Sequence, residues 1–281
     1  MRRPREPIYA AVGRQEITDL EGQIMLIATS TAQARQNQRQ VLANGRDYVL
    51  SEYVGAAPVR GQYVDGNESN DNGLPQGFLV EQPPGAVTLP HFHETNQFQV
   101  FVEGTGLMGK HPAEPLTVQH ANGHTPYGPI VASETGVKYF TLRQRWDPGA
   151  KYMPGARDLL TKGNQRTKLK ADIAPTAAAV RASLAAPVAE TVFPREADGM
   201  AAWLYRFAAG QHETMPSAVG SGGQYLLVAE GSLVLADKTY EKWSTVFVTR
   251  DEDALRIEAG DGELDLLVLQ FPEKPGPGLE A

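Results

Sequence analysis

The chain contains no cysteine among its 281 residues. This absence excludes disulfide bonds, thiolate metal sites and a cysteine nucleophile, and it fits a reducing compartment. The N-terminal sequence, MRRPREPIYA, lacks the apolar core of a secretory signal, and no apolar run approaches the length of a membrane span. We therefore expect a cytoplasmic protein that works away from the membrane.

Positive charge is also in short supply. The chain has 26 Lys and Arg against 33 Asp and Glu, which gives a net charge of −7. No basic face of the kind that nucleic acid requires is evident, so we expect no nucleic-acid partner. The sequence has no glycine-rich phosphate loop, no G-x-S-x-G elbow and no HExxH motif either. A small molecule is the partner that we expect.

Glycine (28) and proline (20) are plentiful, and 41% of the residues are hydrophobic. From Gly77 to Arg145, short apolar or alternating runs are separated by Gly and Pro, and the same pattern returns from Val192. This pattern is typical of short β-strands joined by turns. Between the two regions lies the Ala-rich stretch APTAAAVRASLAAP, where we expect one helix over Thr176–Ala185.

The two β regions share an internal repeat. Gln97 and Gly104 enclose six residues, FQVFVE, and Gln224 and Gly231 enclose YLLVAE. Two β units of one design are the simplest explanation. We expect an arm with early strands over 1–74, a first unit over 75–149, a linker over 150–191, a second unit over 192–272 and a tail over 273–281.

Within the arm, we expect one strand at Ile24–Thr29. The polar stretch after it is a candidate for a short helix ending at Gly45.

The stretch LPHFHETNQFQVFVEG, residues 89–104, holds the residues with the clearest chemistry. Residues two apart in a strand point to the same face, so His91 and His93 share a face. After a tight turn, the returning strand can place Gln97 beside the two imidazoles. Two neutral imidazoles and an oxygen ligand suit Fe, Mn, Ni, Cu or Zn. Alternatively, the two histidines only form hydrogen bonds inside the fold.

The spacing of these residues resembles the first motif of the cupin superfamily. Gly85, His91, His93, Gln97 and Gly104 stand at the spacings of that motif, with Gln97 in the position where the family has glutamate. The resemblance implies an all-β bicupin, with two jelly-roll barrels in one chain, similar to quercetinases and aromatic dioxygenases. It also implies a homodimer, because cupins often pair through edge strands.

The second cupin motif is altered. Pro126 and Gly128 match it, but Val131 stands where the family has its last histidine ligand. His124, two residues before Pro126, is our candidate for a replacement ligand. The expected cofactor is one divalent transition metal in the first barrel, held by His91, His93, Gln97 and His124. Glutamine is a neutral ligand, so this set should bind metal more weakly than the family set.

The second unit lacks these ligands. The two histidine positions of the motif fall on Ala218 and Gly220, and we interpret His212 as a loop residue. We expect no metal there and a structural role, or a second pocket without metal.

Three further residues are candidates for contact with a substrate. Phe101 alternates with Gln97 along the returning strand, and Tyr127 lies inside the second motif. Arg143 and Arg145 alternate in KYFTLRQR and could receive a carboxylate. The alternative for both arginines is a solvated strand face.

Three functions remain open at this point. The first is a metal-dependent, dioxygenase-like enzyme that acts on a small organic substrate, aromatic or hydroxylated. The second is a bicupin that binds or senses a small molecule without turnover. The third is a metal-dependent isomerase or lyase. The amide of Gln97 cannot act as a general base, and the sequence assigns no catalytic residue.

Overall fold

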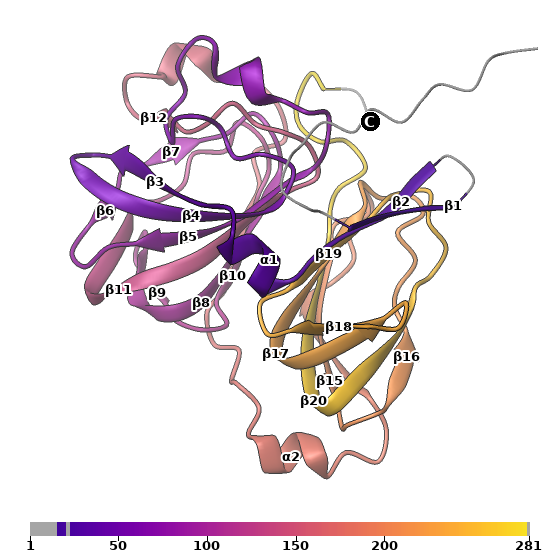
Figure 1. Cartoon of the computed structure of the whole chain (residues 1–281). Helices are drawn as coiled ribbons and strands as arrows, with labels where there is room; N and C mark the ends of the chain where they lie inside the picture. The colour runs from indigo at the N-terminus through magenta and orange to yellow at the C-terminus, as the bar shows by residue number, and fades with distance from the viewer. Residues whose placement is uncertain (1–15, 21–22, 280–281) are drawn as a thin grey trace, which may run out of the picture.

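The computed structural model of the protein describes residues 16–20 and 23–279. These residues form two antiparallel β-barrels that lie side by side (Figure 1), and each barrel is built on a nine-stranded sheet. No helix in the described ranges is long and apolar enough to cross a membrane. The all-β, two-barrel jelly-roll architecture expected from the sequence is therefore confirmed.

Barrel 1 contains the histidine motif. Its main sheet runs in the order β13 (Thr167–Lys170), β10 (Val118–Ala121), β8 (Gln97–Met108), β11 (Ile130–Arg143), β5 (Gln76–Gln82), β4 (Arg46–Val54) and β3 (Gln38–Ala43). Two short strands extend it, β6 (Val87–Thr88) beside β11 and β9 (His111–Ala113) beside β8. A separate pair is formed by β7 (His91–Phe92) and β12 (Lys151–Tyr152).

Barrel 2 repeats this plan. Its sheet runs in the order β1 (Glu16–Leu20), β2 (Gln23–Thr29), β19 (Thr245–Val248), β17 (Gln224–Leu235), β20 (Arg256–Gln270), β15 (Ala201–Phe207) and β14 (Val188–Phe193). Strand β16 (His212–Thr214) pairs with β20, and β18 (Lys238–Glu241) pairs with β17. His212 is exposed on β16 and not in a loop.

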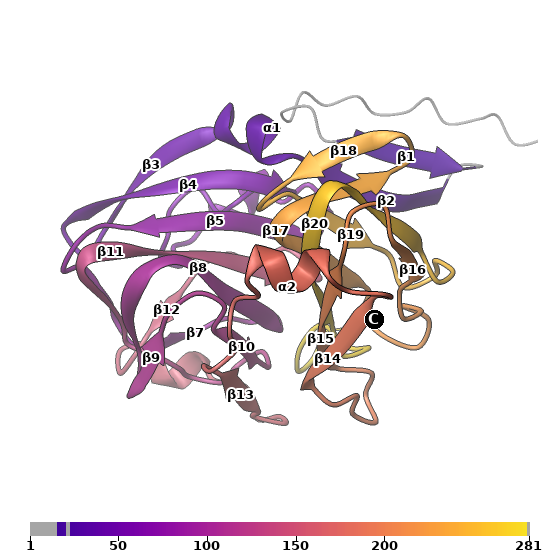
Figure 2. The same cartoon turned by 90° about the horizontal axis from the view of Figure 1, so that it is seen from below.

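The N-terminal region contributes strands to both barrels. Strand β2 pairs with β19 in barrel 2, whereas β3 and β4 extend barrel 1. Helix α1 (Thr31–Arg35) joins them and lies between the barrels in both views (Figures 1 and 2). The predicted helix toward Gly45 is therefore shorter than expected, since Gln38–Ala43 is a strand. Asn44 and Gly45 both have positive φ and form the two-residue turn of a β-hairpin.

The region between the barrels is also partly structured. Strand β13 extends barrel 1 through β10, and the expected helix is α2 (Ala178–Ala182). A buried ion pair joins α2 to barrel 2, with 3.2 Å between Arg181 Nη1 and Asp265 Oδ2. Two 3₁₀ turns, η1 (Asn67–Asn70) and η2 (Arg157–Leu159), lie in the remaining connections.

Strand alternation decides where the site lies. On β8, Phe98 and Val100 point into a core shared by both barrels, where Phe98 packs on Phe271 with 5.1 Å between ring centroids. Gln99, which lies between them in sequence, points into barrel 1. Apolar side chains fill the interior of barrel 2, among them Phe207, Leu226, Val228, Leu264 and Leu266. The polar interior of barrel 1 is therefore the place where a ligand can bind.

Candidate functional site

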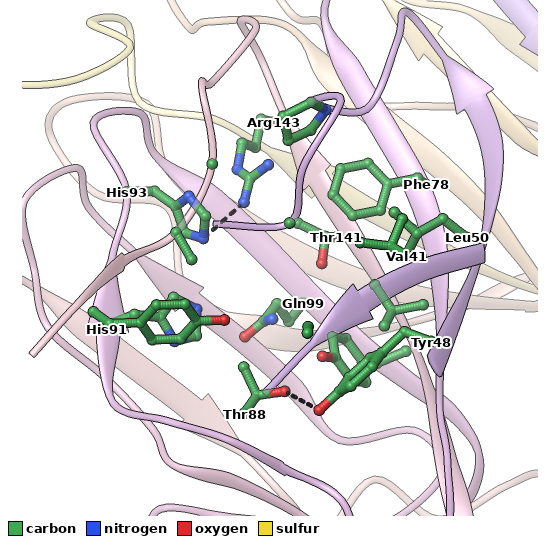
Figure 3. Close-up of a pocket in the computed structure, with 18 of the residues that line it drawn as sticks. Val41, Tyr48, Leu50, Phe78, Thr88, His91, His93, Gln99, Thr141 and Arg143 are labelled. Atoms are coloured by element: carbon green, nitrogen blue, oxygen red, sulfur yellow. Dashed lines mark hydrogen bonds between the residues drawn. The ribbon is translucent and has the colours of Figure 1, made fainter. Parts of the chain in front are cut away.

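A cavity of about 80 Å³ opens inside barrel 1. Figure 3 shows its two unlike sides: His91, His93 and Arg143 lie on one side, and Val41, Leu50 and Phe78 on the other. Gln99 and Thr141 lie between them. A cavity with a polar and an apolar wall suits a small organic molecule.

Hydrogen bonds fix the orientation of both motif histidines. His91 Nδ1 lies 2.7 Å from the carbonyl oxygen of Leu89, which can only accept, so this nitrogen carries the proton. His93 Nδ1 lies 2.7 Å from Oδ1 of Asp147 and donates to this carboxylate. In both rings, Nε2 is left as a hydrogen-bond acceptor. Metal-ligating histidines use the same arrangement.

Asp147 holds the histidine side of the cavity in place through hydrogen bonds. Its fully buried carboxylate accepts hydrogen bonds from the backbone N–H groups of Glu94 (2.8 Å) and Gly149 (2.9 Å), as well as from His93. Burial acts to raise the pKa of Asp147, but His93, Arg143 and these donors lower it further than burial raises it. The group is therefore a buried anion.

Arg143 lies across the cavity wall with 2% of its surface exposed, whereas Arg145 is exposed. It stands opposite Gln97 in the β8–β11 register. Its Nη2 donates to His93 Nε2 and to Gln97 Oε1, both at 3.0 Å, and Nε also donates to Gln97 Oε1 at 3.3 Å. Nη1 donates to Gln76 Oε1.

The Arg143 guanidinium occupies atoms that the predicted metal site would need. A metal ion would need the lone pairs of His93 Nε2 and Gln97 Oε1, and both atoms accept hydrogen bonds from Arg143. The fixed positive charge also repels a divalent cation at this position. Within the described part of the chain, no group of three or more His, Asp or Glu side chains could hold a metal ion. The residues, arranged in this way, do not fit a metal.

The structure does not bring His124 to the other predicted ligands. Its Nδ1 accepts the backbone N–H of Thr161 at 3.0 Å, and its ring packs on Phe92 with 5.4 Å between centroids. Phe92, the last residue of β7, lies between His91 and His93 in the sequence and points to the opposite face. His124 has a φ of +56°, which breaks the alternation on which its prediction depended.

The other predicted contacts differ in position. Tyr127 lines the cavity, and its ring lies 4.5 Å from that of His91 between centroids. Phe101 belongs to the apolar core of barrel 1, where it packs on Tyr139 at 5.2 Å between centroids, and it does not line the cavity. Sequence reasoning missed Asp147 and Gln76, for which the sequence carries no motif.

The two histidines and Tyr127 on the cavity wall are uncharged near neutral pH. Burial, with a smaller effect from His93, lowers the pKa of His91 to about 3. Burial and the positive charge of Arg143 lower the pKa of His93 to about 4, and they outweigh Asp147. Burial raises the pKa of Tyr127. These side chains are therefore hydrogen-bonding groups at neutral pH and poor carriers of protons.

Two buried polar atoms on the lining of the cavity, Gln99 Oε1 and Tyr127 Oη, have no hydrogen-bond partner among the described residues. A buried polar atom without a partner costs about 1–3 kcal/mol, so such atoms are normally satisfied by water or a ligand. They offer a bound molecule one acceptor and one hydroxyl.

No protein-family model matches the chain, and no curated protein matches its sequence. Solved structures do match its fold. A candidate dioxygenase from Nostoc punctiforme has a TM-score of 0.52 at 11% identity, over 84% of this chain and 87% of its own. A pirin from Escherichia coli in complex with nickel(II) has a TM-score of 0.50 at 12% identity, over 88% and 99% of the two chains.

A variant of oxalate decarboxylase from Bacillus subtilis is similar to the same degree, with a TM-score of 0.51 at 10% identity over 90% of this chain and 78% of its own. Identities this low establish the fold alone. This chain shares the two-barrel β fold of these structures, as the motif spacing predicted.

Proposed function

We propose that the protein binds a small organic molecule in the cavity of barrel 1. The observation that carries this proposal is a pair of unsatisfied polar atoms, Gln99 Oε1 and Tyr127 Oη, on two residues that line the cavity. The apolar wall opposite them, with Leu50 and Phe78, would cover the body of the ligand.

The chemistry of the cavity supports binding over turnover. His91 and His93 have pKa values of about 3 and 4, far from those of a general base at neutral pH. Gln97 is an amide and cannot exchange a proton. The function that fits these groups is the binding or sensing of a small molecule without chemistry.

Filling the cavity should abolish binding. Thr141 is buried on β11 and lines the cavity, so Thr141→Phe places a ring where the ligand would lie. We expect the parent protein to bind at least one of benzoate, phenylacetate, benzamide and benzyl alcohol in a calorimetric titration. Thr141→Phe should weaken that binding by about tenfold or more, because a ligand cannot enter a filled pocket.

The matched control is Thr135→Phe, the same change at an exposed position of β11. It should leave the affinity within about twofold of the parent. The proposal fails if none of the four compounds binds, or if Thr141→Phe binds them as well as Thr135→Phe does.

A second candidate is the metal-dependent, dioxygenase-like enzyme acting on an aromatic or hydroxylated substrate, or a metal-dependent isomerase or lyase. The observation in its favour is the protonation pattern of His91 and His93, which leaves Nε2 of both rings as an acceptor. The Arg143 guanidinium opposes it, since it would have to leave His93 and Gln97 before a metal could bind.

Metal loading separates the two candidates. After incubation with Fe(II), Mn(II), Ni(II), Cu(II) or Zn(II) and removal of free metal, we expect elemental analysis to find no stoichiometric ion. His91→Ala should retain as little metal as the parent protein does. One ion per chain in the parent, lost in His91→Ala, would instead support the enzyme, and oxygen uptake would then distinguish a dioxygenase from an isomerase or lyase.

A further inference from the structure

The positive charge of Arg143 has no direct counter-ion. Its three acceptors are the amide oxygens of Gln76 and Gln97 and Nε2 of His93, and none of them belongs to a carboxylate. No carboxylate in the described ranges lies within ion-pair distance of it, and Asp147 contacts the far nitrogen of the His93 ring. A buried charge without an ionic partner is costly, and proteins normally pair it or use it.

Arg143 also keeps one unused donor. A guanidinium has five N–H groups. The contacts to Gln97, His93 and Gln76 use the Nε hydrogen, both Nη2 hydrogens and one of the two on Nη1. The second Nη1 hydrogen has no acceptor among the described residues. A buried cation with a free donor at the wall of a cavity is suited to an anionic oxygen.

The side chains around the guanidinium indicate that the rest of the ligand is apolar. Its carbon lies 5.6 Å from the ring centroid of Phe78, and Leu50 and Val80 continue this apolar wall. Tyr48 and Thr88, at the other end of the cavity, already bond each other at 3.1 Å (Figure 3). The cavity therefore offers one cationic end and an apolar flank.

We propose that Arg143 stands in for a metal ion between His93 and Gln97 and receives the carboxylate of a small acid with an aromatic or branched apolar body. This proposal rests on the proposed function, since it names the class of molecule that the cavity binds. The competing explanation is structural: Asp147 balances Arg143 through the His93 ring, and the guanidinium only ties β5, β8 and β11 together.

A comparison of benzoate with benzamide tests the proposal. The two compounds have nearly the same shape, and only benzoate is charged. In calorimetric titrations of the parent protein, benzoate should bind at least about tenfold more tightly than benzamide. Arg143→Gln should bring this ratio close to one. The matched control, Arg145→Gln, removes an exposed arginine two residues away and should preserve the ratio.

A second variant covers the case in which Arg143→Gln fails to fold. Gln97→Glu is nearly isosteric and places a carboxylate against Nη2 and Nε of Arg143. The proposal expects an internal ion pair that abolishes the preference for benzoate while Arg143 remains in place. If the preference persists in Gln97→Glu, Arg143 is not the group that receives the carboxylate, and the proposal is overturned.

The remaining outcomes are distinct. If benzoate and benzamide bind the parent equally, the carboxylate proposal fails and the proposed function stands. If neither compound nor the other probes bind, both fail. Stoichiometric metal that is present in the parent and unchanged in Arg143→Gln would show that Arg143 does not occupy the metal position, which also overturns the proposal.

Discussion

Replacing Asp147 with asparagine should lower the free energy of unfolding by about 1–3 kcal/mol, the usual cost of leaving a buried hydrogen-bond donor without its acceptor. The carboxylate accepts from Nδ1 of His93 and from the N–H groups of Glu94 and Gly149. An asparagine would turn an NH2 group toward at least one of these donors.

Urea denaturation at pH 7 measures this effect, with Asp158→Asn as the control because Asp158 is exposed. The control should change the free energy of unfolding by no more than about 0.5 kcal/mol. If Asp147→Asn loses less than about 1 kcal/mol, the carboxylate does not hold this side of the cavity. The orientation of His93 would then need another explanation.

The two barrels could be predicted from the repeat because its glycines are sterically required. Gly104 has a φ of +73°, and a Cβ atom there would lie 2.2 Å from the carbonyl oxygen of Gly136. Gly231, its counterpart in the repeat, has a φ of +74° and faces Glu263 in the same way. Only glycine allows the strands to approach so closely. The spacing of these glycines therefore predicts the fold even where the metal-ligand positions of the motif hold other residues.

The positions of the N-terminal strands could not be predicted. Strand β2 pairs with β19, more than 200 residues later, and nothing in the local pattern of Ile24–Thr29 identifies that partner. The hairpin of β3 and β4 could have been predicted from the sequence, since Asn44-Gly45 is a typical two-residue turn. The polar composition of β3 instead favoured a helix, because its exposed edge position does not require apolar side chains.

Alternation accounts for the position of part of the site and not of the rest. His91 and Arg143 lie on strands whose faces can be read from the sequence, His93 directly follows β7, and all three line one cavity. Gln76 and Asp147 reach them from another strand and from the loop after β11, so only tertiary structure brings them together. No motif indicates that Arg143 would donate hydrogen bonds to His93 and Gln97, the residues expected to hold a metal.

Lowering the pH from 7 to 4.5 should reduce the free energy of unfolding by roughly 3–5 kcal/mol through His91 and His93. Their pKa values fall from an ordinary 6.5 to about 3 and about 4 in the folded protein. Between these values the unfolded chain binds protons that the folded chain does not. Stability from these two groups is therefore complete above pH 6.5 and is lost as the pH falls.

Two other buried groups affect the same pH dependence. Burial also lowers the pKa of His120, so this ring adds to the loss of stability as the pH falls. Asp147 adds to that loss only below its ordinary pKa of 3.8. Urea denaturation at several pH values should show His91→Asn with a clearly shallower dependence than the parent. His111→Asn, at an exposed position, should keep the parent dependence. A parent stability that is constant from pH 7 to 4.5 would mean that the two rings take up protons as readily in the folded protein as in the unfolded chain. The hydrogen bond from Arg143 to His93 could then not persist at pH 4.5, because a protonated imidazole has no lone pair to accept it.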